Sequence, residues 1–183
     1  MAGVSALQVM TDVLSVKSGD TVLVRGSAGG VGGFAVMIAK SLGARVIAVA
    51  RGRGVDAARS LGADQVVDGS SDDWGSSIPP VDAALDLVGS GDPSSCLALV
   101  RPGGRLASLV GQPDQGAAAD REIEASLVQI GVNTERLTRL AQLVDAGVVQ
   151  PRIHESHSLD DIAAAFDSLA AGRVLGKIAI RMR

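Results

Sequence analysis

Short apolar runs alternate along this chain with longer stretches of helical period. The alternation starts at residues 3–16, where apolar side chains recur every three or four positions, and continues after a break at 18–20. The pattern predicts strands at 21–25, 44–50, 65–68, 81–89 and 105–111, a sixth strand within 121–131 and a last strand at 176–182. It predicts helices at 3–16, 31–42, 55–62, 133–147 and 159–171, a helix from 94 that Pro102 and two glycines end, and an extended piece around Ile153.

Strands separated by helical crossovers are typical of a parallel, doubly wound sheet. We therefore expect an α/β fold of the Rossmann type, with about six strands plus a C-terminal helix and strand. In helix 159–171, Ser158 is a suitable N-cap and Asp161 stands near position N3. The polar segment 111–120 contains a proline and is the segment expected to be loose. The apolar face of helix 159–171 is expected to point inward; it consists of Leu159, Ile162, Phe166 and Leu169.

Composition narrows the possible functions. The 183 residues fit one sizeable domain with a real core, because 46% of them are apolar. The net charge of −3 and the three aromatic residues argue against nucleic acid as a partner. A single cysteine, Cys96, fits a reducing cytoplasm. The N-terminus does not resemble a signal peptide, and the sequence has no apolar run of about 20 residues for a membrane helix.

Residues 24–33 read VRGSAGGVGG, directly after the apolar run 21–24. A strand, a glycine turn and a helix in this order form the part of a dinucleotide site that binds the pyrophosphate. The backbone N–H groups of Gly29, Gly30 and Val31 are expected to point at the phosphates, and the helix dipole adds positive potential there. Gly32 would let the helix sit close to the strand. A purely structural turn is the alternative, and a P-loop is excluded because no Gly-Lys-Ser/Thr ends the loop.

The end of the second strand indicates which cofactor is bound. NAD sites place an Asp or Glu about 20 residues after the glycines, to accept from the ribose 2′-hydroxyl. Here that position holds Ala50, followed by Arg51 and Arg53. A guanidinium pairs with a 2′-phosphate, so the sequence predicts NADP(H). The alternative is that both arginines are solvated loop charges.

Several motifs together resemble a known family. GDTVLVRGSAGGVGGFAVMIAKSLGARVIAVA is similar to the nucleotide-binding domain of the medium-chain dehydrogenase/reductase superfamily, in particular its zinc-independent NADPH:quinone oxidoreductase branch. SLGADQVVD, VDAALDLVG, LVRPGGRLASLVG, LAQLVDAGVVQPRI and GRVLGKIAIRM follow in the family's order, so the resemblance spans nearly the whole chain. Ser27 replaces the first glycine of the strict GxGxxG pattern, which is usual in this branch.

The resemblance implies a set of cofactor-binding residues. They are Ser27, Ala28, Gly29, Gly30 and Val31 at the pyrophosphate, Arg51 and Arg53 at the 2′-phosphate, and Val88, Gly89, Val110 and Gly111 beside the ribose and nicotinamide. It also implies a single NADP(H)-binding Rossmann domain over residues 1–183, with 1–18 as the linking helix and 150–183 as a C-terminal return segment. The family's barrel-like catalytic domain, which forms half of the acceptor pocket, is not expected in this chain.

No catalytic or metal-ligating residue is predicted. There is no tyrosine to donate a proton, and the zinc ligands of the zinc-dependent relatives belong to the other domain. His154 and His157 flank Glu155, but in an extended segment only one of them is expected on a given side. Cys96 is expected to be buried and structural. Lys177 could approach the cofactor, but a solvated side chain at a strand start is the expected outcome. Asp82 and Asp86 share a strand face, with Asp86 near the cofactor cleft.

Two functional hypotheses remain open. In the first, the chain is part of an NADPH-dependent oxidoreductase that acts on a quinone, enone or similar small-molecule acceptor, and is inactive alone. In the second, it is a stand-alone NADP(H)-binding or sensing module. The strand within 121–131 is a candidate sheet edge, so a homodimer through sheet edges is also expected.

Overall fold

The computed structural model describes residues 1–89 and 94–182. The strands are β1 (Thr21–Arg25), β2 (Arg45–Ala50), β3 (Gln65–Asp68), β4 (Val81–Asp86), β5 (Val100–Ser108), β6 (Glu124–Leu127), β7 (Ile153–Ser158) and β8 (Lys177–Arg181). The helices are α1 (Ala2–Gln8), α2 (Gly30–Ser41), α3 (Gly54–Ser60), α4 (Ser94–Leu97), α5 (Gln115–Asp120), α6 (Thr134–Asp145) and α7 (Ile162–Ala170). A π-helical turn (Val9–Val13) extends α1, and a 3₁₀ turn (Trp74–Ser77) precedes β4.

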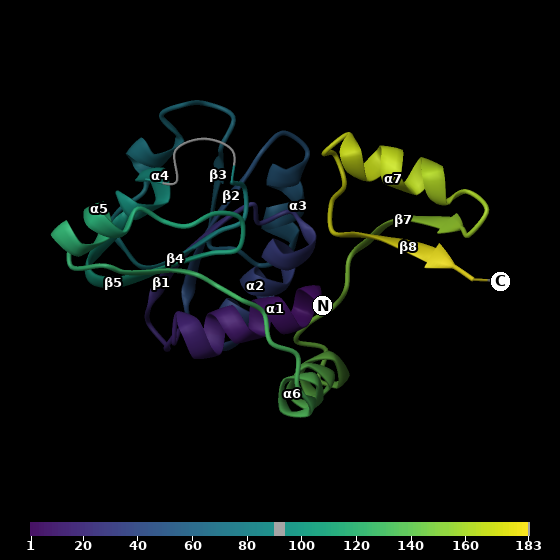
Figure 1. Ribbon diagram of the computed structural model, residues 1–183, viewed down its shortest axis with the longest axis horizontal. Coiled ribbons are helices and arrows are strands. Elements are labelled where there is room, and N and C mark those ends of the chain that lie inside the picture. The colour runs from purple at the N-terminus through teal and green to yellow at the C-terminus, as the bar shows by residue number, and fades with distance from the viewer. Residues whose placement is uncertain (90–93, 183) are drawn as a thin grey trace.

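Six strands form one parallel sheet in the order β3-β2-β1-β4-β5-β6. The chain starts in the middle at β1, runs outward to β3, and then returns to β4 on the other side of β1 (Figure 1). The predicted doubly wound Rossmann-type sheet is confirmed. Its strand order reverses between β1 and β4, and ligands of such sheets bind beyond the carboxyl ends of the strands at that point.

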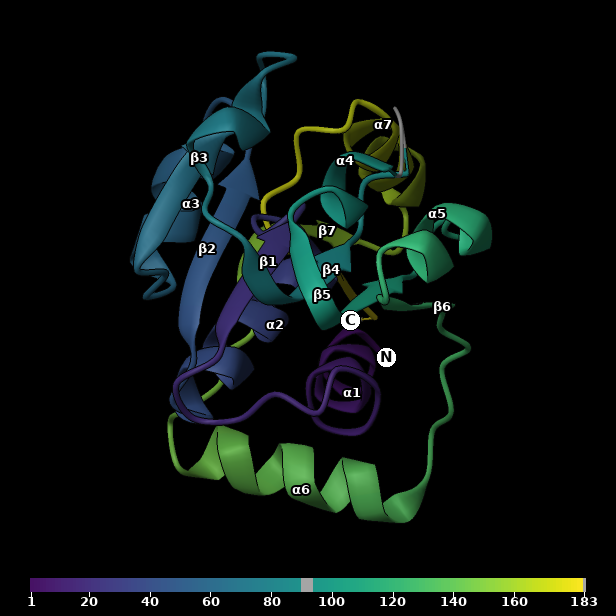
Figure 2. The same ribbon diagram turned by 90° about the vertical axis from the view of Figure 1, so that its left-hand side faces the viewer.

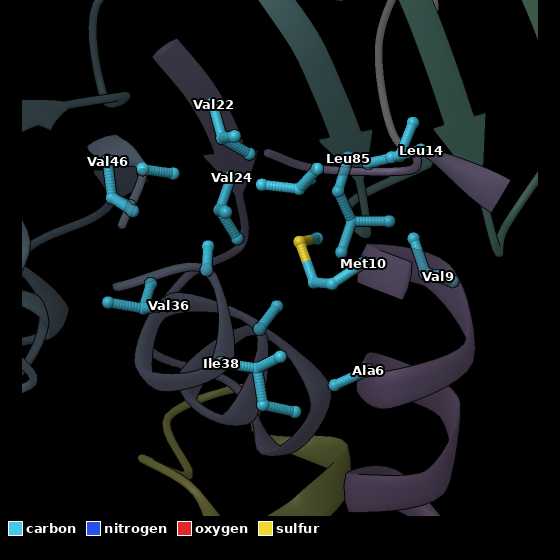
Figure 3. Packing of buried hydrophobic residues seen from close by; sticks show 14 of the residues in the cluster. Ala6, Val9, Met10, Leu14, Val22, Val24, Val36, Ile38, Val46 and Leu85 are labelled. Carbon is cyan, nitrogen blue, oxygen red and sulfur yellow. The ribbon is translucent and has the colours of Figure 1, made fainter. Parts of the chain in front are cut away.

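Helices cover both faces of this sheet because its strands are apolar on both sides. Val22, Val24 and Leu85 pack against α1 and α2 in one cluster of buried residues (Figure 3). Leu23 and Leu106 point to the other face, where the 3₁₀ turn, α4 and α5 supply the second cluster. The predominance of Val, Leu, Ile and Ala in both clusters agrees with the near absence of aromatic residues.

The predicted helix 3–16 is formed by α1 and its π-helical turn, and it lies under α2 and beside α6 (Figure 2). The Gln8 side chain donates to the Gln129 carbonyl at 3.0 Å and accepts from the Gly131 N–H at 2.9 Å. These two bonds hold the segment between β6 and α6 against the helix.

Two local predictions were wrong. The helix expected from 94 ends at Leu97, because Val100 is buried against Val81 and starts β5. Pro102 and its two glycines then lie within an irregular stretch of that strand. The segment 111–120, expected to be loose, ends in helix α5, whose N-cap Asp114 accepts from the Ala117 N–H at 3.0 Å.

Residues 153–181 form a unit that stands beside the main sheet (Figure 1). β7 and β8 pair in parallel as a separate two-stranded sheet, and α7 connects them. The expectation that Ser158 is the N-cap was wrong, because α7 begins one residue after Asp161, which is its N-cap residue. The Ser158 hydroxyl still accepts from the Asp161 N–H at 3.3 Å.

The expectation that the apolar face of α7 points inward was wrong. Ala165 is the buried residue of this helix, whereas Phe166 and Leu169 are 64% and 57% exposed and Leu159 and Ile162 are also exposed. We call these four exposed residues the α7 face. The helical period correctly marked them as one apolar face, but nothing in the described part of the chain covers that face.

Candidate functional site

A cavity of about 560 Å³ opens beyond the carboxyl ends of β1, β2 and β4, where the strand order reverses. Its walls come from the turn after β1, the end of β2 with the start of α3, the turn after β4, and the segment that precedes β8. The lining residues are Arg25, Gly26, Ala28, Gly29, Val49, Ala50, Arg51, Gly54, Gly69, Leu87, Val88, Gly172, Val174 and Leu175.

The glycine-rich turn is fastened to β2. Gly26 has φ +83°, a conformation that favours glycine, and its N–H and that of Ser27 both donate to the Val49 carbonyl at 3.0 and 3.1 Å. The Ser27 hydroxyl donates to the same carbonyl at 3.0 Å and is fully buried. The buried Ser27 side chain therefore fixes the turn to β2 and does not face the cavity.

Helix α2 begins under the cavity without a side-chain cap. Its N-cap residue is Gly29, which is extended and has no side chain to bond the first N–H groups. The first turn of a helix has N–H groups without intrahelical partners, and such groups with the helix dipole bind anions. Gly29 lines the cavity, but its N–H donates to the Gly26 carbonyl at 3.1 Å, so the expectation that this N–H points at the phosphates was wrong. Gly30 and Val31 open the helix directly behind it.

Gly32 explains how close α2 lies to β1. A Cβ atom at this position would collide with the Gly26 carbonyl oxygen and would lie 2.7 Å from Ser27 Cα. A real Cβ does not approach backbone so closely, so only glycine fits. The role that the sequence suggested for Gly32 is confirmed.

The segment before β8 reaches the glycine-rich turn directly. Gly176 forms a parallel bridge with Gly29 and donates its N–H to the Ala28 carbonyl at 3.0 Å. The Lys177 side chain lies across Gly30, so closely that a Cβ on Gly30 would collide with it. The sequence had placed Lys177 in solvent; it is exposed, but it stands beside the N-terminus of α2.

The two arginines after β2 lie in different surroundings. Arg51 lines the cavity, and its Nε donates to the Gly69 carbonyl at 2.8 Å, which holds the side chain along the edge of the site. Arg53 is exposed at the N-cap of α3 and is not among the residues that line the cavity.

The two strand ends expected near the ribose and nicotinamide meet each other. Val88 lines the cavity, and a Cβ on Gly89 would lie 3.0 Å from the Val110 side chain. The Ser108 hydroxyl accepts from the N–H groups of Val110 and Gly111, both at 3.3 Å. Gly89, Val110 and Gly111 therefore form a rim next to the lining residues.

The two aspartates of β4 are used in ion pairs. Asp86 is buried and pairs with Arg25 at 3.3 Å. Asp82 pairs with Arg101 at 2.6 Å at the opposite end of the strand. Burial raises the pKa of Asp82, but the Thr21 N–H and the Arg101 guanidinium more than offset this and hold it below its ordinary value. Cys96 is buried in the second core cluster, as expected.

The histidines of β7 surround one carboxylate. Glu155 accepts from or contacts His157 Nε2 at 2.9 Å, His154 Nε2 at 3.4 Å and the Ser168 hydroxyl at 2.9 Å. The expectation that only one histidine faces a given side was wrong, because an irregularity between Ile153 and Glu155 breaks the strict alternation of the strand. Within residues 1–89 and 94–182, no group of His, Cys, Asp and Glu is arranged to hold a metal ion.

Among the contributors that sequence reasoning did not assign to the site are Arg25 and the segment 172–175, which line the cavity, and Lys177, which was expected in solvent. The glycines of GRVLGK were the available signal for the last two, because Gly176 adopts φ +89° to pass between Ala28 and Arg152. Among the described residues, no helix is both long and apolar enough to cross a bilayer.

A doubly wound parallel sheet with a glycine-rich turn and an uncapped helix at its switch point is the arrangement typical of dinucleotide-binding domains. The family model described as "Zinc-binding dehydrogenase" matches residues 61–180. The chain belongs to this family, and with it to the medium-chain dehydrogenase/reductase superfamily.

Individual relatives agree with this assignment. The 2-methylene-furan-3-one reductase of Solanum lycopersicum is 31% identical over 168 residues, which cover 90% of this chain and 41% of the reductase. The quinone oxidoreductase of Coxiella burnetii superposes with a TM-score of 0.89 at 30% identity, over 100% of this chain and 59% of that one. The mycobacterial protein Rv1454c, solved with NADPH, gives 0.88 at 25% identity, over 98% of this chain and 62% of that one. The chain thus spans about two fifths to three fifths of these relatives.

Proposed function

We propose that this chain is the NADPH-binding part of an oxidoreductase that transfers hydride to a quinone, an enone or a similar carbonyl-type acceptor. The cavity at the switch point carries the proposal, because the glycine-rich turn and the N-terminus of α2 stand on one side of it and Arg51 on the other. A dinucleotide laid across it meets N–H groups at its pyrophosphate and a guanidinium at its adenosine ribose.

The preference for NADPH rests on the residues after β2. Ala50 occupies the place where a carboxylate would accept from a ribose 2′-hydroxyl, and Arg51 lines the cavity next to it. Arg53, two residues on, is exposed and has the length to reach a 2′-phosphate at the cavity edge. The relative that was solved with NADPH supports the same cofactor.

The acceptor class is supported by the names of the relatives. One relative is a quinone oxidoreductase, and another reduces a 2-methylene-furan-3-one, whose C=C bond is conjugated with a carbonyl. Hydride transfer needs a second wall that holds the acceptor against the nicotinamide. The uncovered α7 face supports a further polypeptide beside this one, since an exposed apolar patch marks an interaction surface.

Thermal unfolding with NADPH, with NADH and with no additive tests the cofactor proposal. A ligand that binds the folded state raises the midpoint in proportion to the logarithm of its concentration over Kd. NADPH is expected to raise the midpoint more than NADH at equal concentration. Identical curves in all three samples would contradict the proposal.

A sensing module without turnover is the second candidate, because this chain by itself supplies the glycine-rich turn, the N-terminus of α2 and Arg51, the groups proposed to bind the cofactor. The two candidates differ in the step after cofactor binding. Loss of NADPH absorbance when a water-soluble quinone or enone is added to the full-length protein that contains this chain favours the oxidoreductase. Binding of NADPH to that protein without loss of absorbance favours the module.

We also propose a homodimer through the edge of the main sheet. Among the described strands, β6 is an edge strand that pairs with β5, and its other side is the surface proposed for a second copy. On that side the Ala125 carbonyl already accepts from Gln115 Nε2 at 3.1 Å, so the Gln115 side chain has to move aside when the strands pair. Light scattering after size exclusion is expected to give twice the chain mass at high micromolar concentration. A clean monomer at that concentration would contradict this proposal. The cytoplasmic location likewise stays a prediction.

A further inference from the structure

The floor of the cavity contains a buried ion pair that cofactor binding as proposed above does not use. Arg25 ends β1 and Asp86 ends β4, and the two residues face each other in the register of the paired strands. Arg25 Nη1 lies 3.3 Å from Asp86 Oδ2, with side chains 7% and 4% exposed. Among the ion pairs of the described residues, the others have more exposed partners.

The pair is bonded to the turn that follows β4. The second carboxylate oxygen, Asp86 Oδ1, accepts from the Val88 N–H at 3.1 Å, and the Leu87 N–H donates to the Arg25 carbonyl at 3.2 Å. Gly89 then takes φ +65°, which turns the chain away from the sheet. The Asp86 carboxylate thus ties the path of residues 87–89 to the pair, and the main-chain bond from Leu87 to Arg25 supports the same path.

A buried ion pair contributes little net free energy to the stability of a core. Apolar residues of the same volume often stabilise as much or more, because both charges must leave water. Here the pair stands at the carboxyl ends of β1 and β4, between which the strand order reverses, and Arg25 is itself a lining residue of the cavity. Its guanidinium also lies over the Trp74 ring, 5.5 Å from the centroid, which restrains it from above.

The turn held by the pair lies on one side of the site only. Arg51 and Gly69 line the cavity over β2 and β3, where the adenosine half of a dinucleotide lies in this topology. Leu87 and Val88 line it over β4, so that the other half of the cofactor, the nicotinamide and its ribose, lies against them.

We propose that Arg25 and Asp86 are positioning residues for the nicotinamide half of the cofactor: the pair holds the 87–89 turn in place under the nicotinamide ribose. This inference rests on the proposed dinucleotide function and adds that different residues position the two halves of the cofactor. The adenosine half is bound by residues that the pair does not touch. Loss of the pair therefore weakens binding of the whole cofactor and leaves binding of its adenosine half unchanged.

The test compares two ligands on one variant. Asp86→Asn keeps the side-chain shape and removes the charge that pairs with Arg25. Calorimetry with NADPH and with adenosine 2′,5′-bisphosphate, which carries the adenosine half alone, gives the two affinities. The NADPH affinity is expected to fall about tenfold, as for loss of one hydrogen bond to a charged group, while that of the bisphosphate changes less than about twofold.

Asp82→Asn is the matched control. It removes a carboxylate from the other end of the same strand, where Asp82 also pairs with an arginine and accepts from a backbone N–H. This variant is expected to lose stability and to keep the ratio of the two affinities. If Asp86→Asn does not fold, Asp86→Glu keeps the charge but shifts the carboxylate by one methylene relative to the Val88 N–H, and the same selective loss is expected.

An equal loss for both ligands, or an unchanged NADPH affinity, would overturn the positioning role of the pair. Failure of the unmutated protein to bind either ligand would instead overturn the proposed function. The two ideas are therefore tested separately by one series of titrations.

Discussion

Gly32→Ala tests the geometry that brings the N-terminus of α2 to the cavity. The added Cβ would lie 2.7 Å from Ser27 Cα and 2.8 Å from the Gly26 carbonyl carbon. Both are backbone atoms of a turn that three hydrogen bonds fasten to β2, so neither yields as a flexible side chain would. Restoring a contact of 3.4 Å to Ser27 Cα alone requires the start of α2 to move away by about 0.7 Å, and the nearer Gly26 carbonyl oxygen requires more.

This displacement is expected to have two separate effects, a lower free energy of unfolding and a lower affinity for NADPH. Overpacking of a rigid contact destabilises by about 1–3 kcal/mol. For a domain of this size each kcal/mol lowers the unfolding midpoint by roughly 2–4 °C. The N–H groups at the helix start move with the helix, and losing one hydrogen bond to a charged phosphate weakens NADPH binding by at least about tenfold.

Gly33→Ala is the matched control on the same helix turn. A Cβ there meets Leu61 Cδ1 at 3.4 Å, an ordinary contact with a flexible side chain. Because alanine is the better helix former, this variant is expected to gain about 0.5–1 kcal/mol and to bind NADPH as before. Thermal unfolding and calorimetric titration of both variants measure the two effects. If Gly32→Ala matches Gly33→Ala in both measurements, the close approach of helix to turn does not matter for binding.

Three further predictions concern individual charged side chains. The double change Arg51→Ala with Arg53→Ala should narrow the difference between the NADPH and NADH dissociation constants, and an unchanged ratio in calorimetry would refute the 2′-phosphate assignment. Lys177→Ala should weaken both cofactors alike, because its charge lies at Gly30 rather than at the ribose end; a loss confined to NADPH would refute that placement. Because the pKa of Asp82 is lowered in the folded state, its ionised carboxylate stabilises the fold at pH values above the ordinary pKa of an aspartate. This stabilisation is lost as the pH falls through the folded-state pKa. Asp82→Asn should therefore flatten the acid side of a profile of unfolding free energy measured from pH 6 to about 3. Parallel profiles for both proteins would contradict it.

The main sheet was predictable from the sequence because its strands and helices follow simple periods. Buried parallel strands appear in the sequence as apolar runs. The turn after β1 appears as a cluster of glycines, because a side chain at a position such as Gly32 would collide with backbone atoms. Val100 shows the limit: it follows a helical stretch, and only its pairing with Val81 across the sheet makes it a strand residue.

The C-terminal unit was harder to predict for a physical reason. The period of helix α7 identifies an apolar face, but period alone does not say whether another element covers it. Glu155 and its two histidines illustrate the same limit, since the irregularity in β7 changes which side chains share a face. The return of Gly176 to the Ala28 carbonyl depends on contacts between residues about 150 positions apart, which no local pattern reports.

The binding of NADPH to the unmutated chain tests the central claim most directly. Calorimetric titration is expected to show one site per chain and a lower dissociation constant for NADPH than for NADH. Equal constants for the two cofactors would contradict the assignment of Arg51 and Arg53, and absence of binding for both would contradict the dinucleotide site itself.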